Sequence, residues 1–201
     1  TREGYVFEGW YSNPDCTGEK VREIAASVAE DTELYARWEK RTDLELKVNY
    51  IDKDTSEVLE SETKTAQTFG DVITAESLKK EFKGYSYDSA SADSVKIDTD
   101  INEITLYYVR NSYGYTVNYL EEGTYEVLAA AKNATAAYGT EVTEGAIVID
   151  GYTLVDSDSK SITIDTENNV INFYYAADSF GDGENGDEGD GTPDKYQKKV
   201  I

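Results

Sequence analysis

The stretch LKVNY at residues 46–50 returns as YTVNY at residues 115–119, and this repetition decides the fold. Residues 46–110 and 115–177 align along almost their whole length, first at an offset of 69 residues and, past a two-residue deletion, at an offset of 67. The matched pairs include Phe69-Gly70 with Tyr138-Gly139, Gly84-Tyr85 with Gly151-Tyr152, Ile97-Asp98-Thr99 with Ile164-Asp165-Thr166, and Tyr107-Tyr108 with Tyr174-Tyr175. An order and spacing kept over such a length indicates a tandem duplication.

Each copy opens and closes with strict alternation of apolar and polar residues, which is the pattern of a half-buried β-strand. The alternating apolar positions are Leu44, Leu46, Val48, Tyr50, Ile104, Leu106 and Tyr108 in the first copy, and Tyr115, Val117, Tyr119, Ile171, Phe173 and Tyr175 in the second. Four tyrosines in this register, Tyr50, Tyr108, Tyr119 and Tyr175, are therefore predicted to be core residues. Tyr107 and Tyr174 point to the opposite face of their strands, so they are the candidates for a ligand-binding surface.

A short helix is expected between the strands of the first copy. Thr74 is a typical N-cap, Leu78 and Phe82 share one helix face at i, i+4, and Gly84 is a typical helix end. In the second copy residues 143–150 are shorter and β-branched, which does not favour a helix. Strand pairs, one short crossing helix and a final central strand predict a mainly β fold of tandem β-grasp-like modules. A module of about 65 residues buries a small core, so we expect the modules to stack as a monomeric, elongated array.

Composition excludes several classes of function. Lys and Arg total 19 against 41 Asp and Glu, a formal net charge of −22 that repels nucleic acid and anionic lipid headgroups. The chain has no histidine, which excludes Ser-His-Asp catalysis and zinc sites built on His. Cys16 is its only thiol, which excludes Cys-rich zinc sites and an internal disulfide. No stretch approaches the ~20 apolar residues of a membrane span. Among 41 carboxylates, some pairs will lie at glycosidase distance by chance, so such a pair is no evidence for catalysis. No Asp or Glu stands out in the sequence, and a glycan-active enzyme is therefore the least favoured alternative.

Residues 178–194 are acidic and Gly-rich, with no basic residue. One interpretation is a flexible, self-repelling linker. The other is a calcium loop, because hard cations take several oxygen ligands on a backbone that wraps tightly; the candidate ligands are Asn185, Asp187, Asp190 and Asp194. Residues 195–201 resemble the opening strand of a further module. A lysine isopeptide bond to Asn or Asp also stays open, since many candidates exist and none stands out.

The V-N-Y opening, the aromatic-Gly pair, the central G-Y and the closing Y-Y together resemble the MucBP (mucin-binding protein) repeat of Gram-positive surface proteins. This resemblance covers roughly residues 43–177 and implies ubiquitin-like β-grasp folds, with a first repeat at 42–111 and a second at 112–177. Residues 1–41 resemble a different family. The GYVFEGWY motif at residues 4–11 and LYARW at residues 34–38 are similar to the Listeria–Bacteroides repeat of internalin-type proteins, here without that family's first strand and Gly-rich turn.

These resemblances imply a secreted, non-enzymatic repeat region at a bacterial cell surface or cell wall. The implied partners are mucin, a glycan or a host surface protein, with no cofactor apart from the calcium alternative. A pure spacer that presents another domain is the competing interpretation.

Overall fold

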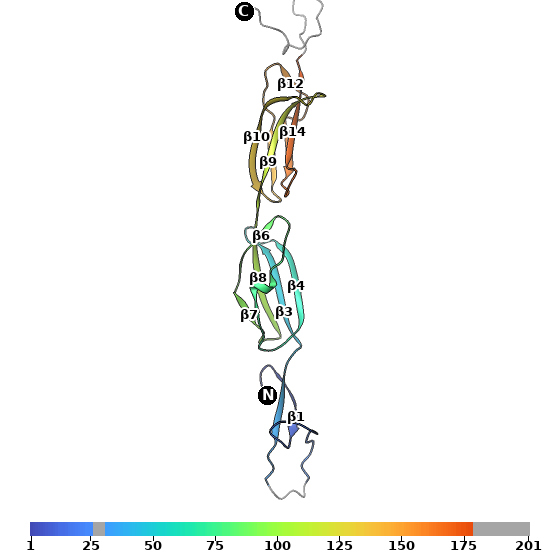
Figure 1. The fold of residues 1–201 in the computed structure, drawn as a ribbon, viewed down its shortest axis with the longest axis vertical. Coiled ribbons are helices and arrows are strands. Elements are labelled where there is room, and N and C mark those ends of the chain that lie inside the picture. The colour runs from blue at the N-terminus through green and yellow to red at the C-terminus, as the bar shows by residue number, and fades with distance from the viewer. Residues whose placement is uncertain (26–30, 179–201) are drawn as a thin grey trace, which may run out of the picture. The chain divides into compact units, whose positions relative to one another are not determined.

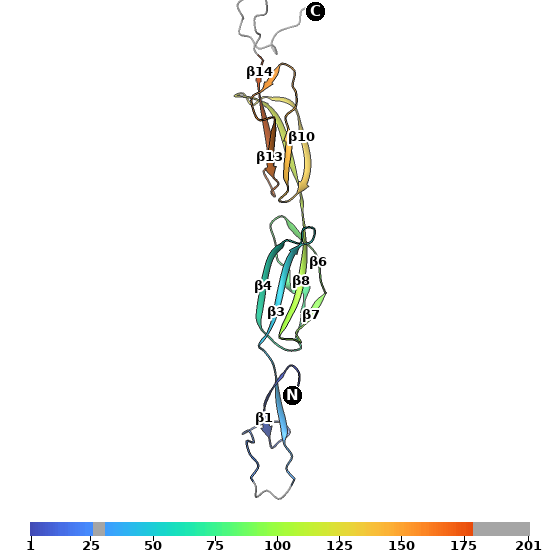
Figure 2. The same ribbon diagram turned by 180° about the vertical axis from the view of Figure 1, so that it is seen from behind.

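The computed structural model describes residues 1–25 and 31–178, which form two compact units (Figures 1 and 2). Of the described residues, the first unit contains those within Thr1–Glu81 and Ser86–Val109, and the second contains Phe82–Tyr85 and residues 110–178. The predicted calcium ligands Asn185, Asp187, Asp190 and Asp194, and the predicted strand at 195–201, lie outside the described residues.

The first unit begins with a small two-stranded sheet. Strand β1 (Tyr5–Tyr11) pairs antiparallel with β2 (Tyr35–Lys40), and the register shifts between Phe7 and Gly9. Gly9 has φ +147°, which suits the irregular backbone of a bulge. Only Tyr11 of this sheet is buried.

A four-stranded mixed sheet follows in the order β4-β3-β8-β6. Its strands are β3 (Leu44–Asp52), β4 (Val58–Gln67), β6 (Tyr85–Ala90) and β8 (Ile101–Arg110). The two central strands β3 and β8 run parallel, and β4 pairs antiparallel with β3. A second, two-stranded sheet joins β5 (Val72–Thr74) to β7 (Ser94–Lys96).

The second copy of the repeat has the same topology. Its main sheet has the order β10-β9-β14-β12, with β9 and β14 parallel at the centre, and a small sheet of β11 and β13 beside it. The strands are β9 (Ser112–Glu121), β10 (Val127–Ala137), β11 (Glu141–Gly145), β12 (Tyr152–Leu154), β13 (Ser159–Thr163) and β14 (Val170–Ala177). Identical strand order confirms that the sequence repeat is a structural repeat.

The core of each repeat is the inward face of its central strands, as the alternation predicts. The four predicted core tyrosines, Tyr50, Tyr108, Tyr119 and Tyr175, are buried with at most 5% of their surface exposed. The remaining alternating residues and one isoleucine from each copy are also buried: Leu44, Leu46, Val48, Ile97, Ile104 and Leu106 in the first copy, and Tyr115, Val117, Ile164, Ile171 and Phe173 in the second.

The predicted helix is wrong in length and in its cap. Only a 3-10 turn forms, at Ala75–Leu78, and the side chain of Thr74 makes no capping hydrogen bond. Lys79 is already extended, with φ −59° and ψ 141°. The next amide, that of Lys80, bonds to the phenol oxygen of Tyr108 at 3.0 Å instead of continuing a helix. A partly buried tertiary hydrogen bond therefore overrides local helix propensity.

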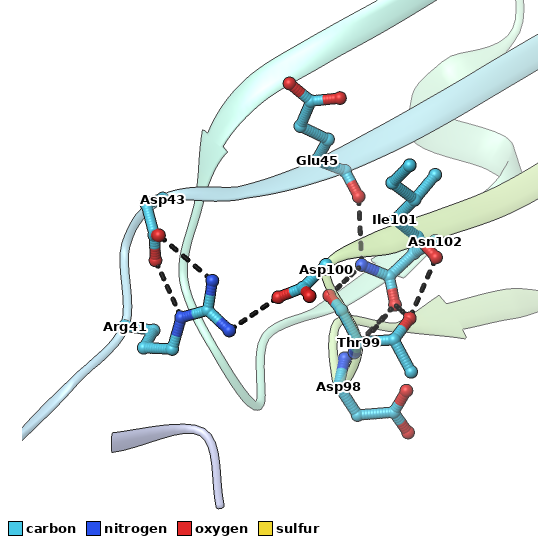
Figure 3. A network of polar contacts seen from close by, with 8 residues as sticks. All are labelled: Arg41, Asp43, Glu45, Asp98, Thr99, Asp100, Ile101 and Asn102. Atoms are coloured by element: carbon cyan, nitrogen blue, oxygen red, sulfur yellow. Dashed lines mark hydrogen bonds and ion pairs between the residues drawn. The ribbon is translucent and has the colours of Figure 1, made fainter. Parts of the chain in front are cut away.

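A buried asparagine closes the turn before each closing strand. The Asn102 side-chain oxygen accepts the amides of Asp98 and Thr99, and its nitrogen donates to the carbonyl of Glu45 at 2.9 Å (Figure 3). In the second copy Asn169 makes the matching bonds to the amide of Asp165 and the carbonyl of Gly114. These amides join the turn to the central strand beside it.

Beside this turn, one arginine holds two carboxylates. The Arg41 guanidinium donates to both oxygens of Asp43 and to Asp100, as Figure 3 shows. Both acids flank the start of the parallel β3 and β8 pair. The hydrogen bond from Arg41 lowers the pKa of Asp43.

Candidate ligand-binding surface

The two tyrosines predicted for the outer face lie there. Tyr107 and Tyr174 are half-buried, and each sits between fully buried neighbours on its strand. Their surroundings differ. The ring of Tyr174 contacts the ring of Tyr125 edge to face, with centroids 6.1 Å apart. The position that matches Tyr125 in the first copy is Ser56, so Tyr107 has no equivalent ring beside it.

Tyr125 occupies the turn between β9 and β10 with φ +60°, and 66% of its surface is exposed. A left-handed backbone is costly for a bulky L-residue. Ser56 adopts the same conformation, with φ +62°, so the turn itself has no need of an aromatic side chain. The tyrosine is therefore a candidate functional residue. The sequence signal that could have found it is an aromatic residue in one copy of a turn where the other copy has serine.

Lys160 on β13 brings a positive charge to the same place. Its ammonium nitrogen lies 5.6 Å from the centroid of the Tyr174 ring, within the range of a cation–π contact. It donates to the carbonyl of Asn172 at 2.7 Å and forms an ion pair with Asp156. The hydrogen bond from Lys160 lowers the pKa of Asp156, which favours the ionised carboxylate. These bonds fix the ammonium beside the ring.

Two amide side chains extend the surface along the sheet. Asn118 on β9 and Asn172 on β14 are register partners, and the Asn118 amide nitrogen donates to the Asn172 side-chain oxygen at 2.8 Å. Two residues further along β14, on the same face, lies Tyr174. Aromatic rings, amides and an ammonium together offer stacking surface and hydrogen-bonding groups. We call Asn118, Tyr125, Lys160, Asn172 and Tyr174 the tyrosine platform.

The corresponding face of the first copy is an ionic network. Asn49 donates to Glu103 at 2.6 Å and accepts a hydrogen bond from Ser61 at 2.9 Å. Lys47 pairs with the same glutamate at 3.3 Å. These groups satisfy one another, which leaves Tyr107 as the only tyrosine that the sequence predicts for this face.

A second group of exposed aromatic rings lies on the β1–β2 sheet. Phe7 and Trp10 are 43% and 45% exposed, and the Phe7 ring lies 5.2 Å from that of Trp38. The Arg2 guanidinium lies 4.1 Å from the ring centroid of Tyr5. A two-stranded hairpin is marginally stable without a packing partner. These rings therefore have a structural reason to be apolar and do not enter the tyrosine platform.

The described part of the chain contains no cluster of three or more Cys, Asp or Glu side chains placed to hold a metal ion. Its buried polar side chains are Asp52, Asn102, Glu121 and Asn169. No lysine is among them, so residues 1–25 and 31–178 lack the buried lysine that an isopeptide bond requires. No helix in these ranges is long and apolar enough to cross a membrane.

Residues 45–109 and 116–176, more than half of the chain, match the model of the MucBP domain. The chain belongs to the MucBP domain family. Residues 1–37, ahead of the two MucBP domains, match the Listeria-Bacteroides repeat domain. Both predicted resemblances are thereby confirmed.

Solved structures similar to this chain include repeats of mucus-binding and cell-surface proteins. The crystal structure of Mub-RV is 16% identical and covers 67% of this chain and 99% of its own, with a TM-score of 0.28. The type 2 repeat of the mucus-binding protein MUB from Lactobacillus reuteri is 17% identical, with coverages of 67% and 100% and a TM-score of 0.29. The Bacillus anthracis TIE protein is 10% identical, with coverages of 73% and 38% and a TM-score of 0.40. No curated protein matches the chain.

Proposed function

We propose that this chain is a non-enzymatic repeat region of a bacterial cell-surface protein that adheres to mucin glycans through the tyrosine platform. The proposal rests on one observation, the contact of exposed Tyr125 with Tyr174 on the outer face of the second MucBP domain. Tyrosine rings present large, rigid and amphipathic surface for stacking, and their hydroxyls and the neighbouring amides suit the polar edges of a sugar. Membership of the MucBP family supports mucin as the source of the sugar.

Charge narrows the class of glycan. The chain carries a formal net charge of −22, and a field of that sign disfavours sialylated or sulfated sugars. The platform itself contributes one ammonium, Lys160, which Asp156 already neutralises. Neutral oligosaccharides are therefore the proposed ligands.

The fold proposed for each MucBP domain is the ubiquitin-like β-grasp, with limits at 42–111 and 112–177. What supports it is the strand order, in which an opening hairpin places its first strand parallel to the closing strand at the sheet centre. The first 41 residues are the proposed Listeria–Bacteroides module. The proposed location is extracellular, at the cell surface or cell wall.

A spacer role is the second candidate, and the repeated topology favours it equally. A spacer needs modules that fold and stack, and it needs no ligand. A spacer role predicts that substitutions in the tyrosine platform leave glycan binding unchanged, whereas adhesion predicts that they weaken it.

The deciding experiment is a mucin and neutral-glycan array probed with the full chain. The variant Tyr125→Ser gives the second copy the serine that the first copy has at position 56, so the turn conformation is kept. The variant Tyr174→Ala removes the other ring of the pair. Each substitution is expected to weaken binding about 5- to 30-fold, corresponding to ~1–2 kcal/mol. Tyr107→Ala is the matched control and should bind as the unaltered chain does. A folded chain that binds no glycan would refute adhesion, and turnover of a glycoside on the same array would overturn the non-enzymatic assignment.

A further inference from the structure

Two glycines of this chain lie directly under an aromatic ring. In the first unit, a Cβ added to Gly4 would lie 2.2 Å from ring atoms of Phe69. In the second unit, a Cβ added to Gly84 would lie 2.1 Å from the ring of Tyr138. Both glycines have positive φ, +73° and +80°. In both cases the next residue is a tyrosine whose ring meets the same aromatic side chain edge to face, with centroids 5.7 Å apart for Tyr5 and 5.8 Å for Tyr85.

The backbone around the two contacts is bonded in the same way. In the first unit, Arg41 donates its amide to the carbonyl of Gly4 at 2.9 Å and accepts the amide of Phe69 at 2.8 Å. In the second unit, the Asn111 amide donates to the carbonyl of Gly84 at 2.8 Å, and the Asn111 carbonyl accepts the amide of Tyr138 at 2.9 Å. One bridging residue thus links a Gly-Tyr pair to the aromatic residue of an aromatic-Gly turn. We call the Gly-Tyr pair with its bridging residue a glycine seat.

The chain contains a third glycine seat, at Gly151-Tyr152. Gly151 has φ +77°, and the amide of Asp178 donates to its carbonyl at 2.9 Å, as Arg41 and Asn111 do in the other two. Within the described ranges, however, no atom lies within 4 Å of a Cβ added to Gly151. Positive φ alone explains why this residue is glycine. The hydrogen bond from the Asp178 amide to the Gly151 carbonyl is a second feature that this seat shares with the seats at Gly4 and Gly84.

We infer that the Gly151 seat is a docking site for the aromatic ring of an aromatic-Gly turn on a further MucBP-type module. The ring of the docking aromatic residue would lie on the Gly151 Cα. The backbone amide of that same residue would donate a hydrogen bond to the Asp178 carbonyl. Within the described ranges, the rings of the two aromatic-Gly turns, Phe69 and Tyr138, already cover Gly4 and Gly84. Neither of these two rings is therefore available to the Gly151 of a second copy.

The test uses the full chain with a second copy of residues 112–178 inserted after Asp178, so that the inserted module offers the equivalent of Tyr138. The Hα signals of [13C]glycine report ring contact directly, because protons over the face of an aromatic ring shift upfield. In the inserted chain, Gly151 is expected to move upfield toward Gly4 and Gly84. The glycine equivalent to Gly151 in the inserted module is the internal control and should keep the unshifted position.

Two substitutions in the inserted module complete the test. Replacing its Tyr138 equivalent with Phe should retain the shift of Gly151, and replacing it with Ala should abolish it. A Gly151 signal that ignores the inserted ring would overturn the inference. So would a Gly151 signal that is already upfield in the native chain, because the seat would then be filled without a further module.

Discussion

The phenol of Tyr108 bonds to both backbone groups of Lys80, donating to its carbonyl at 2.9 Å and accepting from its amide at 3.0 Å. Tyr175 makes the same two bonds to Ile147, at 2.8 Å and 3.1 Å. Each phenol thus satisfies the amide and the carbonyl of a residue that lies outside the strands, Lys80 in the first domain and Ile147 in the second. The closing tyrosine of each MucBP domain is therefore a core residue with a specific polar role.

Removing either phenol oxygen should destabilise its domain. Tyr108→Phe and Tyr175→Phe keep the ring but leave an amide and a carbonyl without their partner. We expect the free energy of unfolding to fall by about 1–3 kcal/mol. Urea denaturation followed by tyrosine fluorescence measures it. Tyr107→Phe changes the adjacent residue on the outer face and should alter stability by less than ~0.5 kcal/mol; equal effects at positions 107 and 108 would contradict this role.

The buried asparagines should be as sensitive as the tyrosines. Asn169→Ala leaves the amide of Asp165 and the carbonyl of Gly114 without their side-chain partner. The expected loss is about 1–3 kcal/mol. Asn168, the neighbouring residue with φ +62°, offers a control, because Asn168→Gly relieves a left-handed backbone and should be neutral or slightly stabilising. Hydrogen exchange of the Asp165 amide gives a local readout, and unchanged protection in Asn169→Ala would refute this account.

The sequence could predict the strands and the core, because period-2 alternation depends only on which face is buried. It predicted the helix after Thr74 wrongly, because Leu78 and Phe82 fit a helical face, while the competing bond of Lys80 comes from Tyr108, 28 residues away in sequence. The role of Asn102 was missed since an asparagine in a D-T-D-I-N turn looks like ordinary turn chemistry. Tyr125 was missed because its partner Tyr174 becomes its neighbour only through tertiary folding.

Alkaline pH should weaken the first MucBP domain through Tyr50. Burial, together with the hydrogen bond to Glu62, raises the pKa of Tyr50 to about 12. The unfolded value is about 10, so the folded state favours the neutral phenol. The resulting stabilisation is complete below pH ~10 and is lost as pH rises from there to about 12. Tyr50→Phe cannot ionise, so its stability difference from the unaltered chain should shrink across this window. A difference that is independent of pH from 9 to 12 would contradict the shift.

Calcium binding by the acidic tail remains a prediction. Isothermal titration of the full chain with CaCl2 should show heat of binding, and Asp187→Ala combined with Asp190→Ala should abolish it. The control is Asp156→Ala, which should leave the heat of calcium binding unchanged. Asp156 lies in the described ranges and pairs with Lys160. Calcium heat that survives the double substitution would assign the ion elsewhere, and absence of heat in the unaltered chain would leave the tail as a linker.

Salt dependence should separate neutral from acidic glycan ligands. A chain of net charge −22 repels sialylated or sulfated oligosaccharides, and the repulsion is screened over about 8 Å at physiological ionic strength. Binding of a neutral glycan to the tyrosine platform should therefore change little between 20 mM and 500 mM NaCl, whereas any binding of a sialylated analogue should strengthen as salt rises. Surface plasmon resonance on matched glycans, with and without sialic acid, measures both. Binding of the sialylated form that weakens with salt would mean that a cationic subsite around Lys160 dominates, which contradicts the neutral ligand class.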